Sequence, residues 1–124
     1  MKAVMKALPS GLVLYFVLLA SPAAAQVAGP WHVTGSVSGH DFALDCQFTP
    51  PSTTPGGICV ETKTGKRHIL TKFSVNGAQV MWSYKASYMM FNFDVNYAGT
   101  LTGNNMAGTV TASGHDGNFT ATRQ

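Results

Sequence analysis

The 124-residue sequence predicts an all-β protein, an eight-stranded antiparallel up-and-down barrel with one disulfide. From Gln79 to Thr111 apolar and polar residues alternate at the period of a strand that is buried on one face. Along the chain, eight short runs are separated by Gly, Asn and Pro turn signals, a spacing typical of barrels and sandwiches. No segment has a helical period of useful length. A closed barrel is favoured over the alternative, a β-sandwich, because closure removes both exposed edges.

Residues 1–25 have the pattern of a secretory signal peptide. Two lysines precede an apolar segment centred on Leu12 to Leu19, and three alanines form a small-residue cleavage site before Gln26. The apolar run is shorter than the ~20 residues that span a bilayer, which favours cleavage after Ala25 over a membrane anchor. We therefore expect a secreted or periplasmic protein with a single barrel domain, residues 26–124, and no stable membrane insertion after cleavage.

The charge of the chain does not favour nucleic-acid binding. The formal charge is +3, but two of the eight basic residues belong to the leader. Without them six Lys and Arg face five Asp and Glu, which leaves a charge of +1 and no footprint for a polyanion. The basic cluster of Lys63, Lys66 and Arg67 is expected to be a solvated turn. We expect no nucleic-acid partner.

The first half of the mature chain contains four expected strands. Gly39-His40-Asp41 turns the first into the second. A loop at residues 49–57 follows, whose three prolines have no N–H to donate to a ladder. Thr64-Gly65 lies in the next turn. The expected strands are Trp31–Val37, Phe42–Phe48, Ile58–Thr62 and Arg67–Val75.

The second half contains four more strands. Asn76-Gly77 is the strongest two-residue hairpin signal in the chain. The next two strands are joined near Ala86 to Tyr88, and turns follow at Gly103-Asn104-Asn105 and from Ser113 to Gly117. The expected strands are Val80–Ala86, Phe91–Gly99, Met106–Ala112 and Asn118–Arg123.

Cys46 and Cys59 are the two cysteines, and an even count in an oxidising compartment predicts a disulfide between them. Alternation places Cys46 on the inner face of its strand but leaves Cys59 on the outer face of the next. A cross-strand disulfide requires both on one side. Either a bulge at Gly56-Gly57 shifts the alternation, or Cys59 and Glu61 face inward, and the sequence leaves both open.

Gly29-Pro30-Trp31, at the start of the first strand, resembles the G-x-W motif of the lipocalin and calycin barrels. In that group this Trp is typically covered by a basic side chain from the end of the last strand, which implies a structural seam between Trp31 and Arg123. The segments 99–101, 108–110 and 117–123 also resemble short uncharacterised bacterial secreted proteins with lipocalin-like barrels. The resemblance further implies a ligand mouth at the barrel end opposite the termini.

Six aromatic side chains are the candidates to bind a small apolar or aromatic ligand inside the barrel: Trp82, Tyr84, Tyr88, Phe91, Phe93 and Tyr97. An eight-stranded barrel is just wide enough to be filled by side chains or to hold one small ligand. The alternative is therefore a non-enzymatic interaction or inhibitor module with a filled core, using the proline-rich loop.

No motif predicts a metal, a cofactor or catalysis. His40, Asp41, His115 and Asp116 form two similar tripeptides with their glycines, a weak alternative metal site, but these residues are also ordinary in turns. His32 and His68 are expected on strand surfaces. No G-x-S-x-G elbow, phosphate loop or H-E-x-x-H is present, which favours a non-enzyme. The resemblance keeps a lipocalin-like cyclase as a second alternative.

Overall fold

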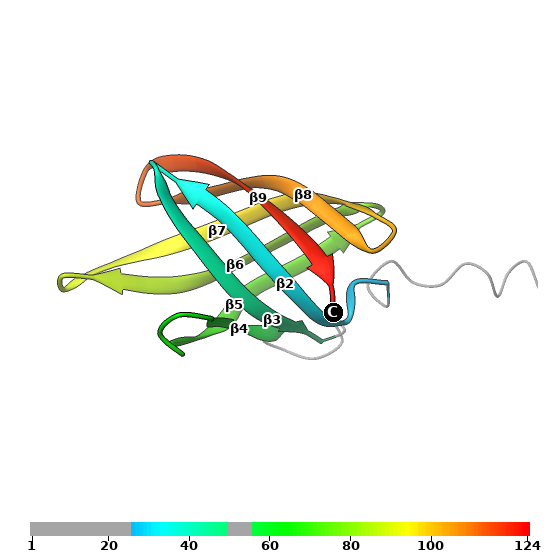
Figure 1. The fold of residues 1–124 in the computed structure, drawn as a ribbon, viewed down its shortest axis with the longest axis horizontal. Helices are drawn as coiled ribbons and strands as arrows, with labels where there is room; N and C mark the ends of the chain where they lie inside the picture. Colours follow the sequence, from blue (N-terminus) through cyan, green and yellow to red (C-terminus); the bar gives the residue numbers. More distant parts are fainter. Residues whose placement is uncertain (1–25, 50–55) are drawn as a thin grey trace, which may run out of the picture.

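The computed structural model describes residues 26–49 and 56–124, in which eight antiparallel strands close into a barrel (Figure 1). The closed barrel predicted from the sequence is confirmed. The expected leader, 1–25, and the centre of the proline-rich loop, 50–55, lie outside the described residues. The strands are β2 (Gly29–Val37), β3 (His40–Phe48), β4 (Gly57–Glu61), β5 (Arg67–Asn76), β6 (Gln79–Tyr88), β7 (Phe91–Thr102), β8 (Asn105–Ala112) and β9 (His115–Arg123).

Each strand pairs with the next along the chain, and β2 pairs with β9 to close the barrel. The hairpin loops are tighter than expected. Ser38-Gly39 and Ser113-Gly114 are two-residue loops in which both residues have positive φ, and His40 and His115 already pair in β3 and β9. This is the type I′ geometry, whose backbone twist matches that of the flanking strands.

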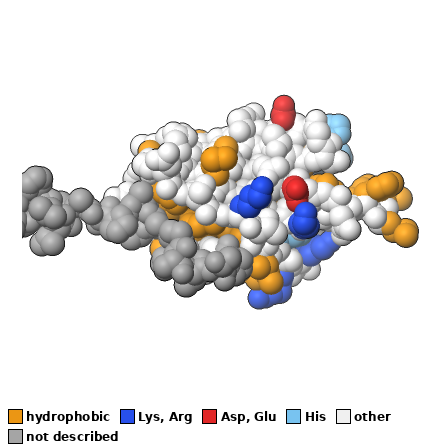
Figure 2. Space-filling model, turned by 180° about the vertical axis from the view of Figure 1, so that it is seen from behind, with side chains coloured by type: hydrophobic (Ala, Val, Ile, Leu, Met, Phe, Trp, Pro, Cys, Tyr) orange, Lys and Arg blue, Asp and Glu red, His pale blue; other side chains and the backbone are white. Residues whose placement is uncertain are grey.

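The β6–β7 hairpin differs most from its expected turn at Ala86 to Tyr88. Both strands continue further, Tyr88 pairs with Phe91, and the loop is Met89-Met90. Each added pair extends the ladder of the hairpin, so the turn moves outward. The hairpin extends beyond the barrel, and its apolar side chains stand at one end of the molecule (Figure 1 and Figure 2).

The Asn76-Gly77 signal does mark a hairpin, but its centre is one residue later than expected. Asn76 pairs with Gln79, so the two loop residues are Gly77 and Ala78. Of these only Gly77 has positive φ, at 62°. The glycine therefore occupies the first central position, as in a type II′ turn, and not the second.

Stacked aromatic rings fill the middle of the barrel. Trp82 lies parallel to Tyr97, with ring centroids 4.7 Å apart and an interplanar angle of 8°. Phe48 and Phe119 contact the same indole from other strands, at 4.9 and 5.3 Å. Such pairs add to the stabilisation that burial alone provides.

A β-bulge in β5 determines which side chains enter the barrel at the β4–β5 side. Leu70 pairs with Tyr84, but Lys72 pairs with Ser83, so Thr71 is the extra residue. Phe73 is half-buried on the inner face, and the extra residue puts Leu70 and His68 on that face as well. His68 is 5% exposed, so the expectation that it lies on the strand surface is wrong.

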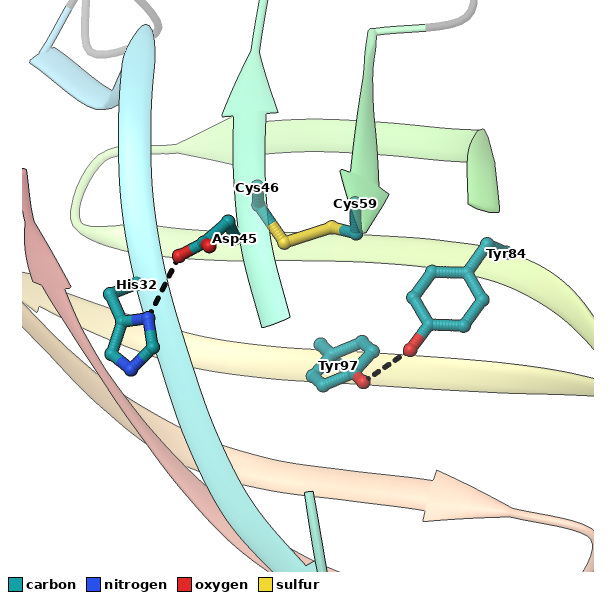
Figure 3. The surroundings of a disulfide bond; sticks show 6 residues. All are labelled: His32, Asp45, Cys46, Cys59, Tyr84 and Tyr97. Atoms are coloured by element: carbon teal, nitrogen blue, oxygen red, sulfur yellow. Dashed lines mark hydrogen bonds and ion pairs between the residues drawn. A yellow bond between two sulfur atoms is a disulfide. The ribbon is translucent and has the colours of Figure 1, made fainter. Parts of the chain in front are cut away.

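The disulfide between Cys46 and Cys59 is confirmed, and it joins β3 to β4 (Figure 3). The two residues are direct partners in the ladder with their Cα atoms 4.0 Å apart. Both are fully buried. Cys59 and Glu61 therefore face inward, which decides the question that alternation left open.

At the barrel end that holds the chain termini, Arg123 lies over Trp31. Its guanidinium carbon is 4.6 Å from the centre of the indole ring, within range of a cation–π interaction. The same guanidinium donates hydrogen bonds to the carbonyls of Gln26 and Ala28 and to Oδ1 of Asn104. The indole N–H of Trp31 donates to the Val27 carbonyl at 2.8 Å. This end of the barrel is closed by packing.

Candidate functional site

The opposite end of the barrel carries a cavity of about 250 Å³, here called the mouth pocket. It lies where β3, the β4–β5 turn and β6 meet. Phe42, Leu44 and Tyr84 provide apolar surface, and Glu61 provides a carboxylate from the inner face of β4. The residues that line it are Asp41, Phe42, Ala43, Leu44, Glu61, Lys63, Thr64 and Tyr84.

Glu61 and His68 form an ion pair beside this pocket. Oε2 of Glu61 lies 2.7 Å from Nε2 of His68, and Oε1 accepts a hydrogen bond from the Thr64 hydroxyl at 2.9 Å. Nδ1 of His68 is 3.3 Å from the Lys85 carbonyl, which can only accept. A carboxylate oxygen can also only accept, so each of these two contacts needs a hydrogen on the ring nitrogen that makes it.

The electrostatics of Glu61 favour the ionised carboxylate. Burial raises its pKa, but the hydrogen bonds from His68 and Thr64 and the nearby charges of His68 and Lys66 outweigh burial, so its pKa lies below the usual 4.5. The Glu61 carboxylate on the inner wall of the mouth pocket is therefore ionised at neutral pH.

Two tyrosines continue the polar cluster into the barrel. The ring of His68 stacks on Tyr84 with centroids 4.4 Å apart. The Tyr84 hydroxyl is 2.7 Å from that of Tyr97, and Figure 3 shows these two tyrosines. Burial raises the pKa of Tyr84 to about 12, although the hydrogen bond to Tyr97 acts in the opposite direction. Burial also raises the pKa of Tyr97, and the neighbouring Tyr84 adds to the increase. Both hydroxyls keep their protons at neutral pH.

One hydroxyl hydrogen of this pair is not used by the bond between them. Two hydroxyls carry two hydrogens, and one of these makes the Tyr84–Tyr97 bond in either direction. Deeper in the barrel, the indole N–H of Trp82 is buried with no hydrogen-bond partner among the described residues. The interior thus has donors that a bound polar group could use.

Comparison with protein-family models, with curated proteins and with solved structures finds no match. The resemblance of Gly29-Pro30-Trp31 to the lipocalin motif stays a prediction.

The six predicted ligand residues divide into two groups. Trp82, Tyr84 and Tyr97 are buried in the barrel interior, and Phe93 is half-buried against that core. Only Tyr84 among them lines the mouth pocket. Tyr88 and Phe91 are 70% and 74% exposed, so Phe91 does not line the barrel interior as expected, and a ligand contact by either residue stays a prediction. They pair with each other at the end of a hairpin that extends past the barrel wall, where strand alternation no longer means burial.

Sequence reasoning missed Glu61 and His68 as site residues. The disulfide supplied the signal that could have found them. If Cys59 must lie on the inner face beside Cys46 on the neighbouring strand, then Glu61, two residues later on the same strand, must face inward too. His68, the ladder partner of Cys59, then follows.

The weak metal alternative gains no support. His40 and Asp41 begin β3, whereas His115 and Asp116 begin β9, and β2 lies between these two strands. In residues 26–49 and 56–124 no three His, Cys, Asp or Glu side chains come together in a group that could hold a metal ion. The same residues include no helix long and apolar enough to cross a membrane.

A wider depression of about 640 Å³ lies at the opposite end, between the β5–β6 and β7–β8 turns. Its lining includes Gly77, Ala78 and Asn104, together with Arg123. The guanidinium of Arg123 already donates to three acceptors and stacks on Trp31. The guanidinium at this depression is therefore engaged in closing the barrel end.

Proposed function

We propose that this protein is a small-molecule binding module that takes a small aromatic ligand with a hydrogen-bonding or cationic substituent into the mouth pocket. The protein acts outside the cytoplasm, which the disulfide and the leader pattern both favour. The resemblance to lipocalins favours the same end of the barrel as the ligand mouth.

The observation that carries this proposal is the polar cluster inside an otherwise apolar barrel. Buried polar and charged groups are more costly than apolar side chains of similar size. His68 is buried, the Glu61 side chain that pairs with it is 34% exposed, and the hydroxyls of Tyr84 and Tyr97 lie among apolar and aromatic side chains. A core selected for stability alone has no need of an ion pair at this end, whereas a binding site needs polar groups held in fixed positions.

The pocket limits the ligand in size and charge. A cavity of about 150 Å³ holds benzene in another protein, so one of about 250 Å³ has room for a single ring with a substituent. The ring would lie against Phe42 and Leu44, and the substituent would face Glu61. Asp41 and Glu61 together disfavour an anionic ligand, although Lys63 and the His68 ring beside Glu61 offset part of their charge.

Thermal unfolding with three probes tests this proposal. Benzylamine and phenol are expected to raise the melting temperature as their concentration rises, and benzoate is expected to have no effect. The substitution Glu61→Gln keeps the size of the side chain but removes its charge. It should weaken benzylamine binding about tenfold, the usual effect of losing one charged hydrogen-bond partner.

Asp94→Asn is the matched control, because Asp94 is an exposed carboxylate that pairs with Lys85 on the outside of the barrel. It should leave benzylamine binding unchanged. The proposal is wrong if no probe shifts the melting temperature and native mass spectrometry of protein from its source detects no retained small molecule. The interaction or inhibitor module would then be the better interpretation.

A further inference from the structure

The four residues at the end of the β6–β7 hairpin, here called the hairpin tip, expose their large side chains. Tyr88, Met89, Met90 and Phe91 are 70%, 72%, 97% and 74% exposed. The hairpin extends past the other loops, and its apolar side chains form the orange group at the right-hand end of Figure 2. Large apolar side chains gathered on a projecting loop are typical of an interaction site.

The backbone of the tip is strained. Met89 and Met90 have φ values of 49° and 74°, in a backbone region that residues other than Gly, Asn and Asp rarely adopt. The β2–β3 and β8–β9 hairpins make the same kind of turn with Ser-Gly. Asn-Gly is the best sequence for such a turn. Folding and solubility both disfavour Met-Met here, so a contact made by these side chains is the remaining explanation.

The half of the barrel that carries the tip is positively charged. From β4 to β7, residues 57–102, five basic residues face the two acids Glu61 and Asp94, which gives a formal charge of +3. Strands β2, β3, β8 and β9 with their hairpin loops carry three acids and one base. Figure 2 shows Lys and Arg side chains between the middle of the barrel and the tip. The basic residues are Lys63, Lys66, Arg67, Lys72 and Lys85.

We propose that the hairpin tip inserts into the interface of a lipid bilayer that contains anionic phospholipid. A projecting, convex group of Tyr, Met and Phe side chains fits the soft boundary between headgroups and acyl chains, where amphipathic aromatic side chains are favoured. The adjacent positive charge is attracted to anionic headgroups, and apolar and electrostatic contributions add. The contact is shallow and reversible, and no strand or helix crosses the bilayer.

This inference does not depend on the mouth pocket. The hairpin tip and the β4–β5 turn that borders the pocket are, however, at the same end of the barrel.

Co-sedimentation of the purified protein with vesicles tests the proposal. Binding is expected to vesicles of phosphatidylglycerol mixed with phosphatidylcholine, and to be at least about tenfold weaker to phosphatidylcholine alone. Added salt should weaken binding. A Phe91→Trp variant gives a second measurement, because brominated lipid should quench the new tryptophan while Trp31 and Trp82 stay buried.

The decisive variant is Met89→Asn/Met90→Gly. It installs the preferred sequence for this turn, so the melting temperature should rise by several degrees while vesicle binding falls at least about tenfold. Loss of binding through misfolding is thereby excluded. Ser38→Asn is the matched control, because it improves the β2–β3 turn without changing apolar surface and should leave vesicle binding unchanged.

Three results would overturn the proposal. The protein does not sediment with either kind of vesicle, or the Met89→Asn/Met90→Gly variant binds vesicles as tightly as the parent, or brominated lipid fails to quench the tryptophan at position 91. If the parent instead self-associates in solution and the double variant does not, the tip is a contact between two copies of this chain.

Discussion

At the scale of single residues, the least expected feature is an ion pair facing the interior of a small barrel. The Glu61 carboxylate is 2.7 Å from His68, whose ring stacks on Tyr84. Each of these groups fixes the next, because the hydrogen bonds leave the ring and the carboxylate little freedom to rotate. Such fixed polar groups next to a cavity are what a specific binding site requires.

The ion pair predicts an acid-sensitive fold. The pKa of Glu61 in the folded protein lies below 4.5, its usual value, so the folded state binds this proton less readily than the unfolded state. The contribution of Glu61 to stability is therefore present above pH 4.5 and is lost as the pH falls through the lower folded pKa. Urea unfolding of Glu61→Gln from pH 6 downward to about pH 3 should show a shallower loss of stability than the parent.

Asp116→Asn is the control for this measurement, since Asp116 is an exposed carboxylate at the same end of the barrel. It should follow the parent curve. If Glu61→Gln loses stability with falling pH as steeply as the parent does, the Glu61–His68 pair does not contribute in this pH range.

At the scale of elements, single-residue features decide which side chains face inward. The extra residue at Thr71 places His68 and Phe73 on the same face of β5, although they are an odd number of positions apart. In β7 and β8 two glycines without side chains face each other: Gly99 leaves room for the ring of Phe119, and Gly108 lets the backbone of Gly99 come close. Both features shape the interior without a change in topology.

The close approach of the β7 and β8 backbones at Gly108 leads to a prediction about stability. A Cβ at this position would lie 1.9 Å from the Ala98 carbonyl oxygen and 2.5 Å from the Gly99 Cα, and backbone atoms cannot move away as a side chain can. Gly108→Ala is therefore expected to destabilise the barrel by about 3 kcal/mol, at the upper end for overpacking. Urea unfolding measures this loss.

Gly65→Ala provides the comparison. Gly65 has a φ of 77° but no atom within 4 Å of an added Cβ, so only backbone strain of about 1 kcal/mol is expected. Equal losses for the two variants would show that the β7–β8 ladder yields to the added methyl group.

At the scale of the whole molecule, the barrel is completed by the contact between its first and last strands. The ladder between β2 and β9 runs from Trp31 with Arg123 to Val37 with Gly117. Beyond the ladder, Arg123 links the last strand to the carbonyls that precede β2. This one side chain therefore joins the two ends of the described chain.

The seam predicts coupling between Trp31 and Arg123. Trp31→Ala and Arg123→Ala should each lower the free energy of unfolding, and the double variant should lose about 1 kcal/mol less than the sum of the two. Ligand affinity at the mouth pocket should hardly change, because the seam is at the other end. Strictly additive losses in a double-mutant cycle would mean that the cation–π contact contributes nothing.

The sequence by itself determined the number of strands, their order, the disulfide and the closed barrel. These depend on local signals, since alternation and turn residues act over a few positions and neighbouring strands of a meander pair by default. Alternation also placed Trp82, Tyr84 and Tyr97 correctly inside. The hairpin loops were predicted in the right places, each within three residues of its true centre.

Only the tertiary structure determined which side chains form the mouth pocket and the polar cluster beside it. Glu61 faces inward because Cys59, on the same strand, is bonded to Cys46, and His68 faces inward because it pairs with Cys59 and a bulge follows it in β5. Neither the orientation of Cys59 nor the extra residue in β5 can be detected from the alternation of a single strand. Tyr88 and Phe91 continue a correct alternation but lie beyond the point where the neighbouring strands end. Burial depends on what packs against a side chain from other strands, whereas alternation reports only which face of its own strand it occupies.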